Sequence, residues 1–235
     1  MLSCSTGICK LFTVLCTVMA NAQISNVFVS TRAVEDIAPD ANPNSAFWRA
    51  APRILADRDP LGNVAPGHRS EIRSRWTHNN LYFLFICPYE KLYLKPGPRT
   101  DIETNELWNW DVAEAFIGSD FANIRRYKEL EVSPRGEWID LDIDLSKPHH
   151  EDGWLWNSGF QIAARTDEKE KVWYACMRIP YSSIDIKTAA AGNVLRVNFF
   201  RAQGPPPGRI EICWQPTHQR TFHVPEAFGI LKLAE

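Results

Sequence analysis

The order of apolar and polar residues predicts a chain built mainly from β-strands. Residues 80–87 (NLYFLFIC) form a continuous apolar run that ends before a proline, and residues 138–145 (WIDLDIDL) alternate apolar and acidic positions. A short continuous run fits a strand buried on both faces, whereas alternation fits a strand with one face in the core. Further runs of this kind lie at 112–117, 127–133, 159–165, 171–179, 194–201, 209–214 and 228–233.

Turn-forming clusters separate these runs, and long helical periodicity is missing. Residues 96–98 (PGP) and 133–136 (SPRG) are typical of tight turns. Short helical turns are expected only at 45–51 and 181–186. The pattern predicts an all-β fold, a jelly-roll-like antiparallel β-sandwich whose two sheets pack face to face. No linker is evident, so residues 23–235 are predicted to form one domain.

The first 22 residues are predicted to be a signal peptide. Residues 11–20 (LFTVLCTVMA) are uncharged and apolar, but the run is shorter than the roughly 20 residues that span a bilayer. Ala20-Asn21-Ala22 follows, and such a small-residue motif is typical of signal peptidase cleavage. Cleavage after Ala22 would give a secreted or periplasmic chain. The alternative is a buried N-terminal helix.

Charge and cysteine content narrow the function classes. The chain has 26 Lys+Arg against 28 Asp+Glu, a formal charge of −2, which argues against nucleic acid as the partner. No other run is apolar enough for a membrane span. Cys87, Cys176 and Cys213 remain after cleavage, and each lies in an apolar run. An odd number leaves at least one thiol unpaired, and we expect buried free thiols rather than a redox or metal motif.

Tryptophan is unusually frequent, with nine residues in the chain, and two of them suggest a ligand site. Trp108 and Trp110 directly precede Asp111 and the run 112–117, which contains Glu114. The C–H face of a sugar ring stacks on an indole, while its hydroxyls require polar partners such as a carboxylate. The alternative is that these tryptophans fill the core.

Several motifs together resemble carbohydrate-binding module family 9, within the wider group of DOMON-like sandwiches. They span most of the chain, from Phe47 to Leu233, in the family's order. They are Phe47-Trp48-Arg49-Ala50, residues 75–83 (RWTHNNLYF), residues 108–117 (WNWDVAEAFI), residues 127–136 (YKELEVSPRG), Arg178-Ile179-Pro180-Tyr181, residues 198–201 (NFFR), Trp214 with Pro216-Thr217, and Pro225-Glu226-Ala227-Phe228-Gly229.

The resemblance implies a calcium-stabilised sandwich that binds sugars, often at the reducing end of a chain. It places the two aromatic clamp residues at Trp108 and Phe222 and the carboxylate at Glu114. The family's amide falls near Gln219, and its arginine falls on Glu131. Phe222 therefore offers less stacking area than the family's tryptophan, and Glu131 reverses a charge.

Three further residues complete the predicted rim of the sugar site. They are Trp110, Asn198 and Arg201, the last as a replacement for the missing guanidinium. The predicted function is non-catalytic binding of an oligo- or polysaccharide, such as reducing-end glucose or xylose units, in support of carbohydrate breakdown. A separately encoded glycoside hydrolase is the expected protein partner.

Other chemistries are alternatives. Glu114, Glu131 and Asp142 lie on successive predicted strands, and a carboxylate pair is what glycoside hydrolysis requires. Some DOMON-like domains hold haem between Met and His, but the one Met of the cleaved chain, Met177, looks like core filler, so no haem is expected. Residues 149–152 (HHED) contain metal-ligand types, yet adjacent residues rarely face one ion. The calcium ligands cannot be assigned from the sequence.

Overall fold

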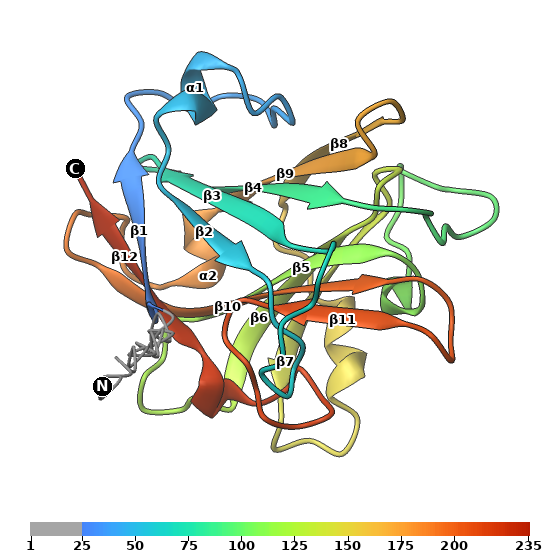
Figure 1. Ribbon diagram of the computed structural model, residues 1–235. Helices are drawn as coiled ribbons and strands as arrows, with labels where there is room; N and C mark the ends of the chain where they lie inside the picture. The colour runs from blue at the N-terminus through green and yellow to red at the C-terminus, as the bar shows by residue number, and fades with distance from the viewer. Residues whose placement is uncertain (1–24) are drawn as a thin grey trace, which may run out of the picture.

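The structure is a computed structural model that describes residues 25–235, so the predicted signal peptide at 1–22 lies outside the described residues. As predicted, strands dominate the chain (Figure 1). The strands are β1 (Val27–Arg32), β2 (Arg53–Ala56), β3 (Ser70–Trp76), β4 (Asn80–Pro88), β5 (Val112–Gly118), β6 (Arg126–Val132), β7 (Trp138–Asp144), β8 (Gln161–Asp167), β9 (Val172–Pro180), β10 (Val194–Gln203), β11 (Ile210–Cys213) and β12 (Gly229–Ala234).

Helical segments are short, and two of them fall where they were predicted. These are α1 (Ala46–Arg49) and α2 (Tyr181–Ile184). Three short 3₁₀ segments are added, η1 (Leu107–Asn109), η2 (His150–Leu155) and η3 (Pro225–Ala227). The sequence reading missed the strands β1, β2 and β3, although β3 alternates buried and partly exposed positions along its length.

The strands join into one twelve-stranded sheet with the order β7-β6-β5-β10-β12-β1-β3-β4-β9-β8, to which β11 adds beside β10 and β2 beside β3. The prediction of an antiparallel sheet is wrong at β1, which runs parallel to both β12 and β3. The first strand lies between the last strand and β3 (Figure 1). Alternation reports which face of a strand is buried, but it says nothing about the direction of the neighbouring strand.

The main core lies between the two halves of this sheet. Side chains of β3, β4 and β9 pack there against side chains of β5, β10 and β12. The rings of Phe83 on β4 and Phe199 on β10 meet edge to face with centroids 4.8 Å apart. Cys87 and Cys176 are buried and free, as is Cys213, which confirms the predicted thiols. Met177 is also fully buried in the main core.

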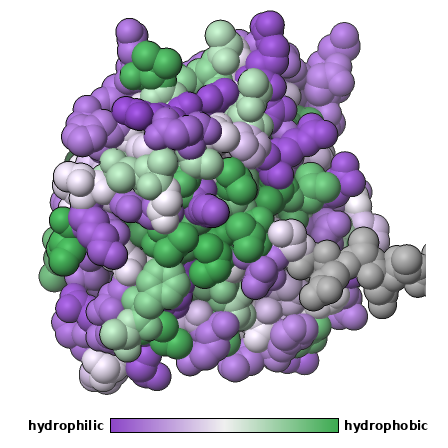
Figure 2. Space-filling model, turned by 90° about the vertical axis from the view of Figure 1, so that its left-hand side faces the viewer, coloured by the Kyte–Doolittle hydropathy of each residue, from purple (hydrophilic) through white to green (hydrophobic). Residues whose placement is uncertain are grey.

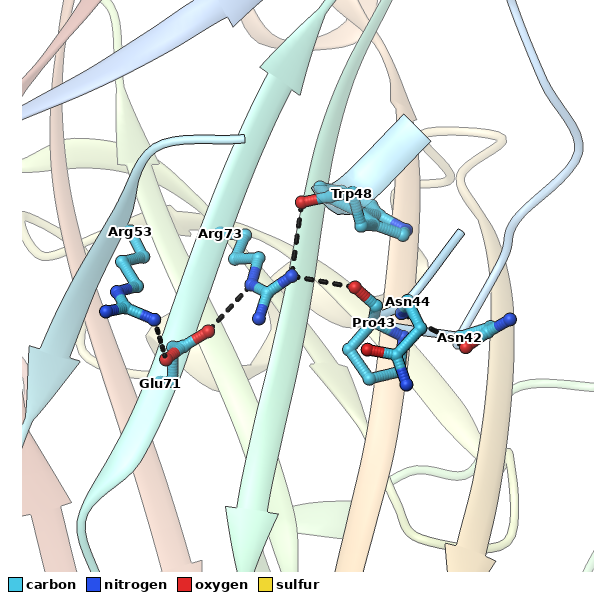
Figure 3. Close-up of polar contacts among 7 residues, drawn as sticks. All are labelled: Asn42, Pro43, Asn44, Trp48, Arg53, Glu71 and Arg73. Atoms are coloured by element: carbon cyan, nitrogen blue, oxygen red, sulfur yellow. Dashed lines mark hydrogen bonds and ion pairs between the residues drawn. The ribbon is translucent and has the colours of Figure 1, made fainter. Parts of the chain in front are cut away.

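The outer side of β4 and β9 is covered by the segment that precedes β2. Trp48 of α1 packs there with Tyr82 and Leu84. Figure 3 shows how Arg73 on β3 holds this segment, because its guanidinium donates to the carbonyl oxygens of Pro43 (2.8 Å) and Trp48 (3.1 Å). The same group pairs with Glu71 at 2.7 Å. This cover explains why β4 reads as a continuous apolar run.

An apolar patch lies on the face that holds β1 and β12. Figure 2 shows apolar side chains gathered in the middle of this face. Val27 and Val29 of β1 and Val194 of β10 are more than one third exposed. The register places Val29 and Val194 on either side of Lys232 of β12, so a charged residue interrupts the patch.

Replacing Gly229 with alanine is expected to lower the free energy of unfolding by about 1–3 kcal/mol, the usual cost of overpacking. A Cβ atom at this position would lie 2.6 Å from the Trp214 ring and 2.8 Å from the Asn26 carbonyl oxygen. Gly208→Ala is the matched control, since a Cβ there has no described atom within 4 Å. Urea denaturation of both variants tests the prediction, and equal losses would contradict it.

Candidate functional site

The candidate site lies on the outer face of β5, β6, β7 and β10, opposite the main core. Residues directly opposite in paired strands share a face. Glu114 of β5 therefore shares this outer face with Phe200 of β10 and Glu131 of β6, and Phe116 of β5 shares it with Glu129. A second cluster of buried apolar side chains covers part of the face, including Phe116, Phe200 and Leu141.

A cavity of about 550 Å³, here called the outer cavity, opens on this face. Aromatic, acidic and basic side chains from strands and loops all reach it. Its lining residues are Glu106, Trp108, Asn109, Glu114, Glu129, Leu141, Ile143, His150, Glu151, Ala202, Arg209, Glu211, Arg220, Thr221, Phe222 and His223. The volume is in the range typical of small-molecule sites.

Three of the predicted site residues meet in the outer cavity, namely Trp108, Glu114 and Phe222. Trp108 comes from η1 and Phe222 from the loop before η3, and both are only partly buried. Phe222 stacks on Phe200 with ring centroids 4.2 Å apart and an interplanar angle of 14°. The two aromatic side chains are thus more than 100 residues apart in sequence and line one cavity with a carboxyl group.

Arg209 and Asp111 hold the loop that carries Trp108. The Arg209 guanidinium donates to the carbonyl oxygens of Trp108, of Trp110 (2.7 Å) and of Gly204 (3.0 Å). The Asp111 carboxylate accepts hydrogen bonds from the backbone N–H groups of Tyr93 (2.9 Å) and Gly204 (2.6 Å). Burial raises the pKa of Asp111, while these donors act in the opposite direction.

Three carboxyl groups gather at the floor of the outer cavity, where Glu114 and Glu129 line it and the predicted site residue Glu131 lies just behind them. The side chains of Glu114, Glu129 and Glu131 are 2%, 4% and 0% exposed. Burial is the main cause that raises the pKa of all three groups, and for Glu129 the value is about 7. Their mutual repulsion raises the pKa of Glu114 and Glu131 further.

Two histidines, His150 and His223, line one side of the outer cavity, and the Tyr127 side chain lies next to them. The His223 Nδ1 lies 2.6 Å from the Tyr127 hydroxyl oxygen, and its ring centroid lies 4.5 Å from that of His150 on η2. Burial and the nearby His150 lower the pKa of His223 to about 4. At neutral pH this imidazole is therefore uncharged and can accept or donate one hydrogen bond at each ring nitrogen.

The remaining predicted rim residues do not line the outer cavity. Trp110 stacks on Tyr93 with centroids 4.6 Å apart, and Asn198 holds the backbone of Gln215 through its amide at 2.9 and 3.0 Å. Gln219 is exposed and outside the lining. Arg201 faces the main core, where its guanidinium donates to the Pro88 carbonyl oxygen at 2.6 Å.

The residues of the alternative chemistries are only partly brought together. Of the three carboxyl groups considered for hydrolysis, Glu114 and Glu131 stand directly opposite each other, with oxygen atoms within 4.8 Å. Asp142 faces away from the outer cavity and pairs with Lys128 at 2.7 Å. In the HHED segment, His150 and Glu151 line the cavity, but His149 does not. The Nδ1 atom of His149 lies 3.3 Å from an oxygen of Glu151.

Sequence reasoning missed Glu129, Arg209 and His223 as cavity residues. Glu129 had a usable signal, because residues two apart on one strand share a face and Glu129 precedes Glu131 by two. Arg209 and His223 carried no such signal. Their places depend on loop paths that bring the turn before β11 and the segment before η3 over the sheet.

A sequence relative covers more than two thirds of this chain. No family model matches the chain. A relative described as an extracellular protein of Arthroderma benhamiae is 24% identical over 176 residues, which cover 69% of this chain and 78% of the relative. Among residues 25–235, no helix is long and apolar enough to cross a membrane.

Solved structures share the fold of this chain at lower sequence identity. The family 9 carbohydrate-binding module of Caldicellulosiruptor kristjanssonii, in complex with cellotriose, matches with a TM-score of 0.61 and 13% identity over 88% of this chain and 93% of that chain. The same module in complex with glucose matches with a TM-score of 0.60 and 14% identity over 88% and 95%. A candidate carbohydrate-binding protein of Bacteroides uniformis matches with a TM-score of 0.67 and 14% identity over 88% and 98%.

The resemblance noted in the sequence is therefore confirmed by structure. The residues from β1 to β12 share their fold with structures of family 9 carbohydrate-binding modules.

Proposed function

We propose that the protein binds carbohydrate without catalysis, in the outer cavity. The observation that carries this proposal is the meeting of Trp108, Phe222 and Glu114 in one solvent-accessible cavity. Partly exposed aromatic rings present flat apolar surfaces to the C–H faces of a sugar. Carboxyl, imidazole and guanidinium groups in the same cavity supply donors and acceptors for its hydroxyl groups.

Each side chain has a separate task in this proposal. One face of Phe222 packs against Phe200, so Phe222 is a fixed plate. Trp108 is held through the backbone of its own loop by Arg209, which keeps its indole positioned before the ligand arrives. Glu114 reaches the same cavity from β5 and accepts hydrogen bonds from hydroxyl groups. Pre-positioned groups bind more tightly because less freedom is lost on association.

The ligand class comes from the structural neighbours, which hold cellotriose and glucose. We accordingly propose a gluco- or xylo-configured oligosaccharide for this chain. The proposal has four further parts. They are secretion after removal of residues 1–22, a structural calcium ion, a two-layer sandwich organisation of residues 23–235, and action beside a separate glycoside hydrolase. An extracellular relative supports the secretion step.

Replacing Trp108 with alanine is expected to weaken sugar binding by about 1–3 kcal/mol, which is about 5- to 150-fold in Kd. The loss follows from removing the apolar plate. Isothermal titration with glucose, cellobiose and xylo-oligosaccharides measures it. Trp110→Ala is the matched control, because Trp110 belongs to the same loop but stacks on Tyr93 outside the cavity.

The outcomes separate the alternatives. Equal affinity in Trp108→Ala and the wild type would rule out the aromatic clamp. Absence of binding to every sugar by the folded wild type would rule out the proposed function. Release of reducing sugar by the purified chain alone would show a hydrolase instead.

A further inference from the structure

We propose that Glu114, Glu129 and Glu131 form a site for one hard divalent cation, such as Ca²⁺, at the floor of the outer cavity. This site goes beyond sugar binding and does not depend on it. The starting observation is geometric. One oxygen atom from each of the three carboxyl groups lies within 4.8 Å of the other two.

That spacing fits the coordination distances of a hard cation. Ca²⁺ binds carboxylate oxygens at about 2.3–2.6 Å, so two ligands on opposite sides of the ion lie about 5 Å apart. Three oxygens that are mutually within 4.8 Å can therefore contact one ion with small side-chain adjustments. All three groups project from adjacent strands, β5 and β6, where Glu114 stands directly opposite Glu131.

A second observation points to a ligand for this group. Glu131 is fully buried, and among the described residues neither of its carboxyl oxygens has a hydrogen-bond partner outside the three glutamates. One oxygen of Glu129 is also buried and unpartnered. Buried polar atoms without partners are costly and rare in folded proteins. A cation bound between the three groups satisfies these oxygens.

Neighbouring charges do not neutralise the three carboxyl groups. No ion pair of the described residues involves Glu114, Glu129 or Glu131. The Arg209 guanidinium acts electrostatically on Glu114 and Glu131, but it donates its hydrogen bonds to backbone carbonyl oxygens of the Trp108 loop. The cavity lining also includes Arg220, which forms none of the described ion pairs with the three groups. A divalent ion matches this excess of negative charge.

A bare ion fits better than the ammonium group of an amino sugar. Glu114 and Glu129 line the cavity, whereas Glu131 lies behind its surface and is inaccessible. An amine attached to a sugar ring reaches only the groups at the surface, but an ion passes between them. Each carboxylate has two oxygens, so Glu114 can bind the ion with one and a sugar hydroxyl with the other.

The test is calorimetric titration of the purified, chelator-treated chain with CaCl₂, and in parallel with MgCl₂ and MnCl₂. We expect one ion per chain at this site, with a Kd no weaker than about 1 mM. A structural calcium ion bound elsewhere would be retained equally by every variant. Glu131→Gln and Glu129→Gln keep the side-chain size but remove a charged ligand, and each is expected to weaken binding at least about tenfold. The matched control is Glu106→Gln, because Glu106 lines the cavity but is not one of the three proposed ligands. The Kd of this variant for the ion should be within about twofold of the wild-type value.

A folding control accompanies the titration. Glu131→Gln removes a buried carboxyl group that lies beside two others, so it should be at least as stable as the wild type in chelator. Addition of CaCl₂ should raise the melting temperature of the wild type more than that of the variant. Loss of ion binding then cannot come from unfolding.

Three results would overturn the cation site. These are unchanged affinity in both variants, absence of binding by all three ions to the folded wild type, and binding of glucosamine in place of an ion. The failure of the sugar proposal is distinguishable, because Trp108→Ala is expected to lose sugar binding and keep the ion.

Discussion

Replacing Asp111 with alanine is expected to lower the free energy of unfolding by about 3–5 kcal/mol, since hydrogen bonds to a charged group contribute about 1.5–3 kcal/mol each. The Asp111 carboxylate is 1% exposed and accepts hydrogen bonds from the backbone N–H groups of Tyr93 and Gly204. Alanine leaves both donors buried without a partner. It also removes a negative charge near the buried Arg201.

The effect should extend to the candidate site. Gly204 also accepts a hydrogen bond from Arg209, which holds the carbonyl oxygens of Trp108 and Trp110. Loosening this turn frees the Trp108 loop, so the surviving folded protein should bind sugar more weakly. Asp111 therefore connects the stability of the sheet to the position of the indole.

Urea denaturation measures the predicted loss. The matched control is Asp101→Ala, because Asp101 forms only an exposed pair with Arg99, and such pairs contribute about 0–1 kcal/mol. A loss below about 1 kcal/mol in Asp111→Ala would show that the loop is held by other contacts.

The wild type is expected to lose about 3 kcal/mol more stability than His223→Gln when the pH falls from 7.5 to 4. The pKa of His223 is about 4 in the folded chain and 6.5 in the reference state. Below pH 6.5 the unfolded chain binds a proton at His223, whereas the folded chain does not until about pH 4. Acid therefore favours the unfolded state across this window.

The groups that face His223 account for the shift. Burial is the first cause, and His150 on η2 is the second; Glu151 acts in the opposite direction. The Tyr127 hydroxyl on β6 is a neutral hydrogen-bond partner at 2.6 Å. Protonating His223 would place a charge beside a second imidazole in a poorly solvated wall.

Denaturation of both proteins at several pH values checks this expectation. Glutamine retains a hydrogen-bonding side chain for Tyr127 and does not titrate. The buried glutamates of the same cavity have raised pKa values and act in the opposite direction, but they are present in both proteins, so their contribution cancels. If the free energies of unfolding of the two proteins changed in parallel with pH, His223 would have the same pKa in the folded and unfolded chain, and the prediction would be wrong.

The candidate site depends on chain segments that are far apart in sequence. Glu114 and Glu129 come from a strand pair, which supplies a rigid floor. Trp108, Arg209 and Phe222 come from loops placed over that floor. Rigid strands carrying variable loops explain how the fold is shared with the family 9 modules at only 13–14% identity.

The sequence by itself determined nine of the twelve strands, β4 to β12, and the alternation of side chains along them. Runs such as 80–87 and 138–145 encode this locally, because side-chain alternation is a property of a single strand. The order of motifs also identified the fold, and it named Trp108, Glu114 and Phe222 as partners. These conclusions came from local patterns and from the family resemblance, and they required no knowledge of contacts between distant segments.

Only the tertiary structure decided the rest. The parallel pairing of β1, the placement of Arg201 in the main core, and the meeting of Glu129 with Glu114 and Glu131 all depend on strand order and register. A one-residue change in register exchanges the faces of a strand. The charge of a cavity is therefore fixed by which strands become neighbours, and no local pattern in the chain contains that information.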